Sequence, residues 1–471
     1  MPEIRRFSRA VTFRQILHLS NEMISGVRAA SWAFAAVLVA FSGGPVLSAQ
    51  ELLTVESAVQ AALAQNPSLR AARASVSEAD ARAAEARSGW FPRVSVTETW
   101  QRGDQPVFVF SSLLAARQFA PANFAIDSLN HPDPIGFFRT SIAVEQLLFD
   151  GGRQGSAGDR ATYRREIAQL SSDEAAATLA LATVQAYGRT LVAEASRRAA
   201  EAALEAARED LVRAEHRRDT GVASDADVLA LVAHVADLEQ RAIHRQGEAA
   251  VSRAQLNRLM GVPIEREYQL APPAESDGVV LAATRIEALL AEAERSRPEL
   301  RRAAAAQQAA DADRTVARAS LLPQVAVQAA FDVSGTQFSD RASAWIAGAA
   351  LRWNLSLGGA ERAQLQAATD ARTRASAEAE DVRAAVHVEV VTALRQLQAA
   401  QARRSAGRAA VDQARESHRI TRDRFDAGLA GVTDVLRASS AVVDAETQRT
   451  AALVDAVVSE AMLRRALGRH P

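Results

Sequence analysis

Residues 66–96 read NPSLRAARASVSEADARAAEARSGWFPRVSV, and residues 297–327 read RPELRRAAAAQQAADADRTVARASLLPQVAV. Pro298 follows Pro67 at the same spacing as Pro323 follows Pro92. Each copy carries alanine, arginine and acidic residues between its two prolines, and then alternating valines. A repeat this long within one chain indicates one structural unit that occurs twice.

Further anchors extend the repeat on both sides of this stretch. Gly358 and Gly359 match Gly151 and Gly152, and the sequence DVL at 434–436 matches DVL at 227–229 at the same spacing. The first copy is longer only between Pro92 and Gly151, within 101–136, where we expect a longer surface loop. We therefore expect a first repeat at 50–260, a linker at 261–284 that is rich in proline and lacks periodicity, and a second repeat at 285–471.

Each repeat predicts one helix followed by two strands. Asn66 is a good helix cap and Pro67 suits the first helical position, so a helix is expected over 67–88. Alternating apolar residues then predict strands after Pro92 and after Pro323, with second strands at 137–149 and 344–356. In the last of these, one face collects Trp345, Ala347, Ala349, Leu351 and Trp353. Alternation over about ten residues is typical of strands in membrane β-barrels, although a half-exposed soluble sheet gives the same pattern for any single strand.

After each pair of glycines the sequence predicts a very long helix and a return helix. The long helices are expected at 153–218 and 361–425, and the return helices at 225–259 and 433–467. At 1.5 Å per residue a long helix spans about 100 Å. A pre-strand helix and a return helix laid end to end nearly match that length, as stacked helices in a tunnel wall would. A filamentous coiled coil is the alternative, but no strict heptad of leucine-type residues is sustained.

The composition excludes several classes of function. The chain has 471 residues, no cysteine and a net charge of −1, and all 55 basic residues are arginine. Disulfides, thiolate metal sites and cysteine nucleophiles are thereby excluded, as are lysine Schiff bases and phosphate-loop lysines. The eight histidines show no metal-ligand spacing, and no catalytic constellation is found. We expect no enzyme activity, no cofactor, no metal and no binding to nucleic acid.

The N-terminus has the order of a secretory signal peptide. Arg28 precedes the apolar run AASWAFAAVLVAF at 29–41, and small residues follow it. The run is too short to span a bilayer as a helix. We expect a signal peptide over 1–49, cleaved near Ser48 or Ala49, with Met23 as the possible true start. A buried helix is the alternative interpretation.

The exported chain resembles the TolC-type outer-membrane efflux proteins. The resemblance rests on AVQAALAQNPSLRAARA at 58–74, ARSGWFPRVSV at 86–96, FDGGR at 149–153, and the paired tips GVASDADVL at 221–229 and GLAGVTDVL at 428–436. It implies a mainly α-helical homotrimer with two tandem repeats and four β-strands per protomer. Three protomers would close a 12-stranded barrel in the outer membrane, continued by an α-helical tunnel across the periplasm.

The resemblance also implies where function lies. The tips are expected to meet a periplasmic adaptor that works with an inner-membrane transporter. Their residues are Gly221, Val222, Ala223 and Ser224 in the first repeat, and Gly428, Leu429, Ala430 and Gly431 in the second. These residues are also what a helix stop followed by a cap requires.

Asp434 aligns with an acidic residue that lines the narrowed periplasmic entrance in this family, and Asp227 is its counterpart in the first repeat. A helix N-terminal aspartate that complements the helix dipole is an equally good interpretation of Asp434. Arg437 stands where a second acidic residue of the entrance can lie. Phe425 and Ala430 replace polar residues of the closed-state contacts, so the entrance departs from the family pattern at three positions.

Two functions follow as expectations. The first is a passive outer-membrane channel, the exit duct of a tripartite efflux pump or type I secretion system. The alternative is a periplasmic helical scaffold or adhesin without a pore. The substrate cannot be inferred from the sequence, because drugs, metal ions and proteins can use the same kind of duct.

Overall fold

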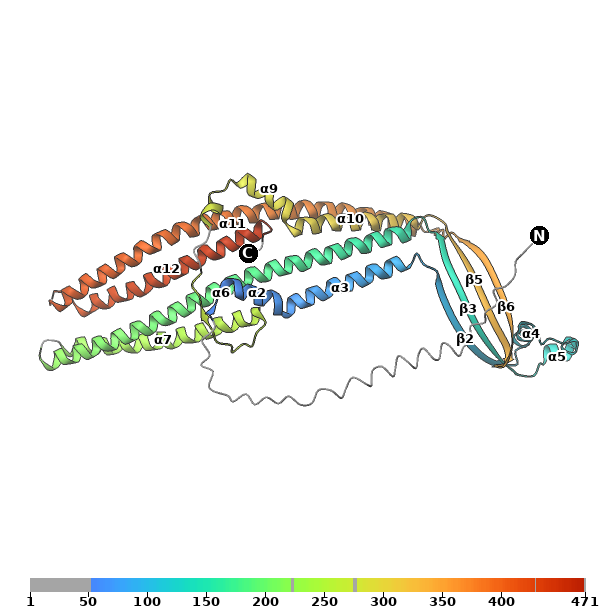
Figure 1. Cartoon of the computed structure of the whole chain (residues 1–471), viewed down its shortest axis with the longest axis horizontal. Coiled ribbons are helices and arrows are strands. Elements are labelled where there is room, and N and C mark those ends of the chain that lie inside the picture. Colours follow the sequence, from blue (N-terminus) through green and yellow to red (C-terminus); the bar gives the residue numbers. More distant parts are fainter. Residues whose placement is uncertain (1–51, 222–223, 274–277, 428, 470–471) are drawn as a thin grey trace, which may run out of the picture. The chain divides into compact units, whose positions relative to one another are not determined.

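The computed structural model describes residues 52–221, 224–273, 278–427 and 429–469, so the predicted signal peptide lies outside the described residues. The long helices are α6 (Arg153–Asp219) and α11 (Ala360–Asp426), and the return helices are α7 (Asp225–Met260) and α12 (Val432–Ala466). Figure 1 shows these two helical hairpins. The predicted long and return helices are confirmed to within one or two residues.

The two pre-strand helices begin at their prolines. Helix α3 (Pro67–Ser88) has the predicted bounds, and the Asn66 side chain accepts a hydrogen bond from the Ser68 N–H. Helix α10 (Pro298–Ala319) starts after Arg297, whose side chain makes no cap bond. Each is preceded by a helix that the sequence analysis did not predict, α2 (Val55–Gln65) and α9 (Ile286–Ser296).

The ends of these helices meet as the sequence analysis predicted. The Asn66 Nδ2 donates to the Leu259 carbonyl over 2.8 Å, which joins the start of α3 to the end of α7. In the second half the Ser296 Oγ donates to the Leu467 carbonyl over 2.5 Å. Helix α6 packs along both α3 and α7, and α11 packs along both α10 and α12. Two short helices thus continue one another beside each long helix.

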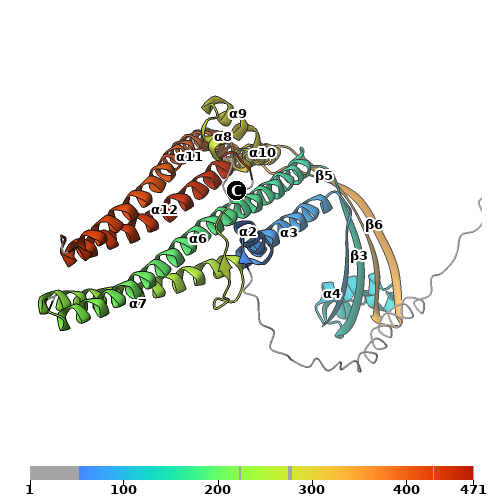
Figure 2. The same ribbon diagram turned by 60° about the vertical axis from the view of Figure 1, so that its left-hand side comes forward.

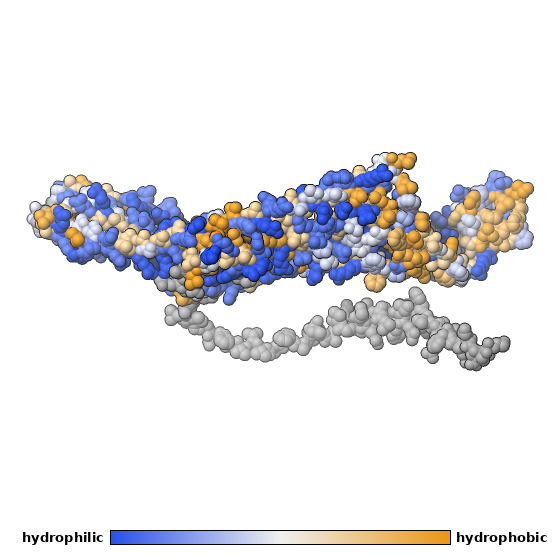
Figure 3. Space-filling view, turned by 90° about the horizontal axis from the view of Figure 1, so that it is seen from above, coloured by the Kyte–Doolittle hydropathy of each residue, from blue (hydrophilic) through white to orange (hydrophobic). Residues whose placement is uncertain are grey.

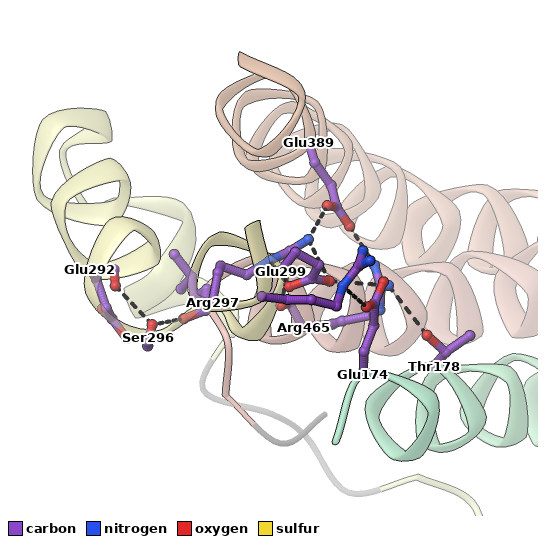
Figure 4. Close-up of polar contacts among 10 residues, drawn as sticks. Glu174, Thr178, Glu292, Ser296, Arg297, Glu299, Glu389 and Arg465 are labelled. Carbon is purple, nitrogen blue, oxygen red and sulfur yellow. Dashed lines mark hydrogen bonds and ion pairs between the residues drawn. The ribbon is translucent and has the colours of Figure 1, made fainter. Parts of the chain in front are cut away.

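The second junction contains an ion-pair network around a buried arginine (Figure 4). Arg297 is 3% exposed and pairs with both carboxylate oxygens of Glu299 at 2.9 and 3.0 Å and with Glu389 at 2.6 Å. Arg465 pairs with Glu389 at 2.6 Å and reaches Thr178 of α6 at 3.3 Å. This network therefore links α10, α11 and α12 to a helix of the first half.

The four long strands form one antiparallel sheet of order β2-β3-β5-β6. The strands are β2 (Arg93–Gly103), β3 (Ile135–Phe149), β5 (Gln324–Gln337) and β6 (Asp340–Arg352). The hairpins β2–β3 and β5–β6 come from the two repeats, and β3 pairs with β5 between them. The four predicted strands are confirmed, although β6 ends at Arg352 rather than at 356. Strands β2 and β6 have no partner on their outer edge among the described residues.

The two faces of the sheet differ in polarity. The register places Val96, Ile142, Phe331 and Trp345 side by side on one face, and all four are exposed. We call this face the apolar face. Its large exposed members are Val94, Val96, Trp100, Ile142, Phe149, Phe331, Trp345 and Leu351. The opposite, polar face carries Arg93, Ser95, Thr97, Arg139, Ser141, Glu145, Gln328, Asp332 and Arg352. In Figure 3 hydrophobic colour gathers at the right-hand end, and blue dominates the paired helices at the left.

Two segments contain more structure than the sequence analysis expected. The longer connection of the first repeat was expected to be a surface loop, but it contains α4 (Pro106–Ala115), the 3-10 helix η1 (Pro121–Phe124) and α5 (Ile126–Asn130). The segment 261–284 contains α8 (Gly278–Ala282) and β4 (Gln269–Leu270), which pairs in parallel with β1 (Leu52–Leu53). The Tyr187 hydroxyl lies 2.8 Å from the Leu53 carbonyl and 2.7 Å from that of Ala271, and burial raises the pKa of Tyr187 to about 12. Tyr187 thereby holds this small ladder against α6.

Among the described residues, no helix is long and apolar enough to cross a membrane.

Candidate functional site at the helix tips

The first tip is a glycine stop followed by a capping box. Gly221 has a φ of +74°, in the left-handed region that ends a helix. Helix α7 then begins after Ser224, whose hydroxyl accepts from the Asp227 N–H at 3.2 Å. The Asp227 carboxylate in return accepts from the Ser224 hydroxyl at 2.7 Å and from its N–H at 3.2 Å. Two otherwise unsatisfied N–H groups at the start of α7 are satisfied in this way.

These bonds set the charge state of Asp227. The Ser224 hydroxyl, and then the Ser224 N–H, hold the pKa of the Asp227 carboxyl below its ordinary value. Both groups donate to the ionised form and so favour it. Asp227 therefore carries its charge at the exposed tip at neutral pH, and it stabilises the first turn of α7.

The second tip repeats this design with a weaker cap. Gly431 replaces the serine, so only its N–H donates to the Asp434 carboxylate, over 3.3 Å. The other oxygen of Asp434 lies 3.9 Å from the Arg437 guanidinium. Both side chains are more than half exposed, and an ion pair of this kind contributes little to stability. Asp434 thus has a capping role, and Arg437 offsets its charge.

The two hairpins contact each other just behind their tips. Ala214, Val228 and Leu231 of the first hairpin are buried together, and Val432 and Leu436 of the second pack against them. A cavity of about 570 Å³ opens beside this contact. Its polar lining includes Asp210, Arg213, His216, Arg217, Asp227 and Arg422. The apolar contact therefore joins the hairpins, and arginines surround the remaining space.

Phe425 takes part in this junction between hairpins. The guanidinium of Arg217, from α6, lies 5.2 Å from the centre of the Phe425 ring, within the range of a cation–π interaction. Sequence analysis placed Phe425 at the entrance but did not find Arg217 as its partner. The cluster of one histidine and two arginines at 216–218 was the available signal for a cationic partner of Phe425.

The structure brings only part of the predicted site together. Asp227, Phe425, Ala430 and Gly431 all line the cavity between the hairpins. Asp434 and Arg437 lie on the exposed surface beside it, and Leu429 is 71% exposed. Val222, Ala223 and Gly428 lie outside the described residues. Sequence analysis missed the contact of Val228 and Leu231 with Val432, although the repeated DVL motif supplied apolar residues at matching positions.

The described part of the chain contains no candidate metal site. No group of three or more histidine, aspartate or glutamate side chains is placed to hold a metal ion there. The two tip carboxylates instead serve as helix caps, Asp227 with Ser224 and Asp434 with Gly431.

Comparison with known proteins identifies the family. The model of the outer membrane efflux protein family matches residues 58–262 and 289–469. The chain belongs to the outer membrane efflux protein family. This confirms the resemblance found in the sequence, and the outer membrane efflux proteins are channels rather than enzymes. No curated protein matches the chain in sequence.

Solved structures of efflux channels share the fold. The CmeC outer membrane channel of Campylobacter jejuni is 15% identical, with 88% of this chain and 85% of that chain covered and a TM-score of 0.76. VceC from Vibrio cholerae is 20% identical over 88% and 96% of the two chains, with a TM-score of 0.72. MtrE of Neisseria gonorrhoeae, solved in an open state, is 18% identical over 88% and 89%, with a TM-score of 0.70. The predicted fold of long helical hairpins joined to strands is thereby confirmed.

Proposed function

We propose that three copies of this chain form a passive channel in the outer membrane. The observation that carries the proposal is the four-stranded sheet, which has an exposed apolar face and two edges without a partner in the described part of the chain. In lipid every backbone polar group needs a partner, so an open sheet of four strands cannot stand alone there. Pairing β2 of one copy with β6 of the next would close the sheet and leave the apolar face toward lipid.

The helical hairpins would then form the wall of a tunnel that extends into the periplasm. Their length of about 100 Å suits such a tunnel and exceeds what a bilayer can contain. The channel would be the exit duct of a tripartite efflux pump or a type I secretion system. The inner-membrane transporter would supply the energy, and a periplasmic adaptor would contact the helix tips.

The experiment is to purify the mature chain in detergent and reconstitute it in planar bilayers. Trimers that resist dissociation on heating, and stable single-channel currents, are the expected result. A soluble periplasmic monomer without currents would overturn the channel and favour the scaffold or adhesin instead.

We further propose that Asp434 lies at the periplasmic entrance of the channel. Its carboxylate is exposed and its cap bond is the longer of the two. The 3.9 Å pair of its second oxygen with the exposed Arg437 is weak enough for a cation to compete with it. Removing a ring of three carboxylates would widen the entrance and weaken its attraction for cations.

Asp434→Ala is expected to raise single-channel conductance and to reduce block by multivalent cations. Asp444→Ala, on the same helix but further from the tip, is the matched control and should leave both unchanged. Identical conductance and cation block in Asp434→Ala and the native channel would refute the entrance assignment.

A further inference from the structure

The insert 104–134 of the first repeat folds over the polar face of the sheet. Phe137 of β3 lies on that face and is 3% exposed, because Phe108 of α4 packs edge-on against it with ring centres 6.3 Å apart. Helix α4 also contacts β5. Figures 1 and 2 both place α4 at the end of the sheet that is remote from the long helices.

The far end of α4 is tied to the β5–β6 hairpin. Arg117 has a φ of +57°, a left-handed conformation that is costly for a non-glycine residue. In this conformation its guanidinium donates to the Ser343 carbonyl over 3.0 Å. The Gln118 amide donates to Asp340 at 3.1 Å and accepts from the Thr336 hydroxyl at 2.8 Å. The insert thus crosses from β2 to β6 over one face.

Helix α4 has a second apolar side, on which Phe110 packs against Phe119 while Val107 and Leu114 stay exposed. Val109, Ser112 and Ala116 are buried toward the sheet, at the spacing of one helix face. Val107 and Leu114 lie on the opposite side and are 74% and 49% exposed. Apolar residues on both sides of a helix indicate that both sides become covered.

The dimensions of the proposed trimer identify what would cover that side. Twelve strands spaced about 4.8 Å apart and tilted by about 40° give a barrel about 24 Å wide between backbones. A helix is about 10–12 Å across with its side chains. Three such helices on the inner wall would meet at the axis and leave no open passage.

Resting on the channel proposed above, we propose that the α4 helices of three copies meet at the barrel axis and close the outer exit of the duct. The exposed side of α4 would therefore be covered by α4 of a second copy of this chain. Val107 and Leu114 form the contact, and Arg117 and Gln118 hold each helix at the rim.

A single cysteine tests the contact, because the chain has no other cysteine. Under oxidation the Leu114→Cys trimer should give covalent dimers on denaturing gels, since two of three cysteines near the axis can pair. Val96→Cys, on the apolar face, is the control and should stay monomeric. Intact trimers without any Leu114→Cys dimer would overturn the proposal.

Conductance gives a second test that does not depend on cross-linking. Replacing 105–133 by a short glycine-serine linker should raise single-channel conductance several-fold, and Arg117→Ala with Gln118→Ala should raise it by a smaller factor. Unchanged conductance in both variants, with currents in the native protein, would overturn the exit closure alone. Absence of trimers and currents in the native protein would instead overturn the channel itself.

Discussion

Single residues at the tips combine a structural and an electrostatic role. Asp227 closes a full capping box with Ser224, whereas Asp434 has only the Gly431 N–H as its cap donor. The serine accounts for the difference, because glycine offers no hydroxyl to complete the box. We infer that the first tip is the more rigid of the two, and that Asp434 is the carboxylate with more freedom to meet an ion.

The lowered pKa of Asp227 gives the first tip a defined pH dependence. A carboxyl whose pKa falls on folding contributes stability above its ordinary pKa of about 4 and loses it as the pH falls through the lower folded value. Local opening at the start of α7 should therefore increase in acid in the native protein and be nearly independent of pH in Asp227→Ala.

Amide hydrogen exchange at 224–228, corrected for intrinsic rates, measures this opening. Asp225→Ala, in the same turn but outside the capping box, should retain most of the pH dependence. Equal acid sensitivity in Asp227→Ala and the native protein would argue against the cap as its source.

At the scale of the elements, a glycine at the end of each return helix lets that helix approach the start of the pre-strand helix closely. Gly261 has a φ of +72°, and a Cβ there would lie 2.7 Å from the Gln65 carbonyl oxygen. Gly468 has a φ of +75°, and its Cβ would lie 2.9 Å from the Ser296 backbone. The close end-to-end stacking in each repeat therefore requires glycine.

Gly261→Ala should destabilise the protein by about 2–4 kcal/mol, because it combines left-handed strain with a clash against backbone. Gly221→Ala has the same strain but nothing within 4 Å of the new Cβ, so it should cost only about 1 kcal/mol. Denaturant unfolding of both variants provides the comparison. Equal losses would mean that the junction does not need the close contact.

Close approach also explains a glycine inside α6. A Cβ on Gly188 would lie 2.4 Å from the Val454 side chain of α12. Gly188→Ala should therefore cost about 1–3 kcal/mol, whereas Gly247→Ala, where no atom lies within 4 Å, should stabilise α7 by about 0.5–1 kcal/mol. Thermal unfolding that ranks the two variants in the opposite order would contradict this packing.

At the scale of the whole molecule, the outer edges of β2 and β6, which have no partner among the described residues, are where the proposed trimer would pair its copies. In a trimer these edges would pair with neighbouring copies, and their amides would become protected. Hydrogen exchange should be slow at 93–103 and 340–352 in the trimer and fast after dissociation. The inner strands β3 and β5 should stay protected in both states. Fast exchange at both edges in the trimer would exclude pairing between copies.

Much of the fold could be predicted from local signals. Asn66 with Pro67, the glycine pairs before the long helices, and the alternating valines and tryptophans of the strands act through capping, backbone freedom and side-chain periodicity. These effects depend only on neighbouring residues, so the helix and strand boundaries were largely correct. The internal repeat also predicted the order in which the helices and strands follow one another in each half.

Other features were decided by contacts between distant segments. Tyr187 of α6 contacts the carbonyls of Leu53 and Ala271 beside the ladder of β1 and β4, and Phe425 contacts Arg217 on another helix. The extra residues within 101–136 were predicted to form a surface loop, but they contain helices, and Phe108 of α4 packs against Phe137 of β3. The sequence by itself determined the long helices, the four long strands, the repeat and the family, since these follow from local chemistry. Only the tertiary structure decided which faces meet, because that choice depends on burial between residues far apart in the chain.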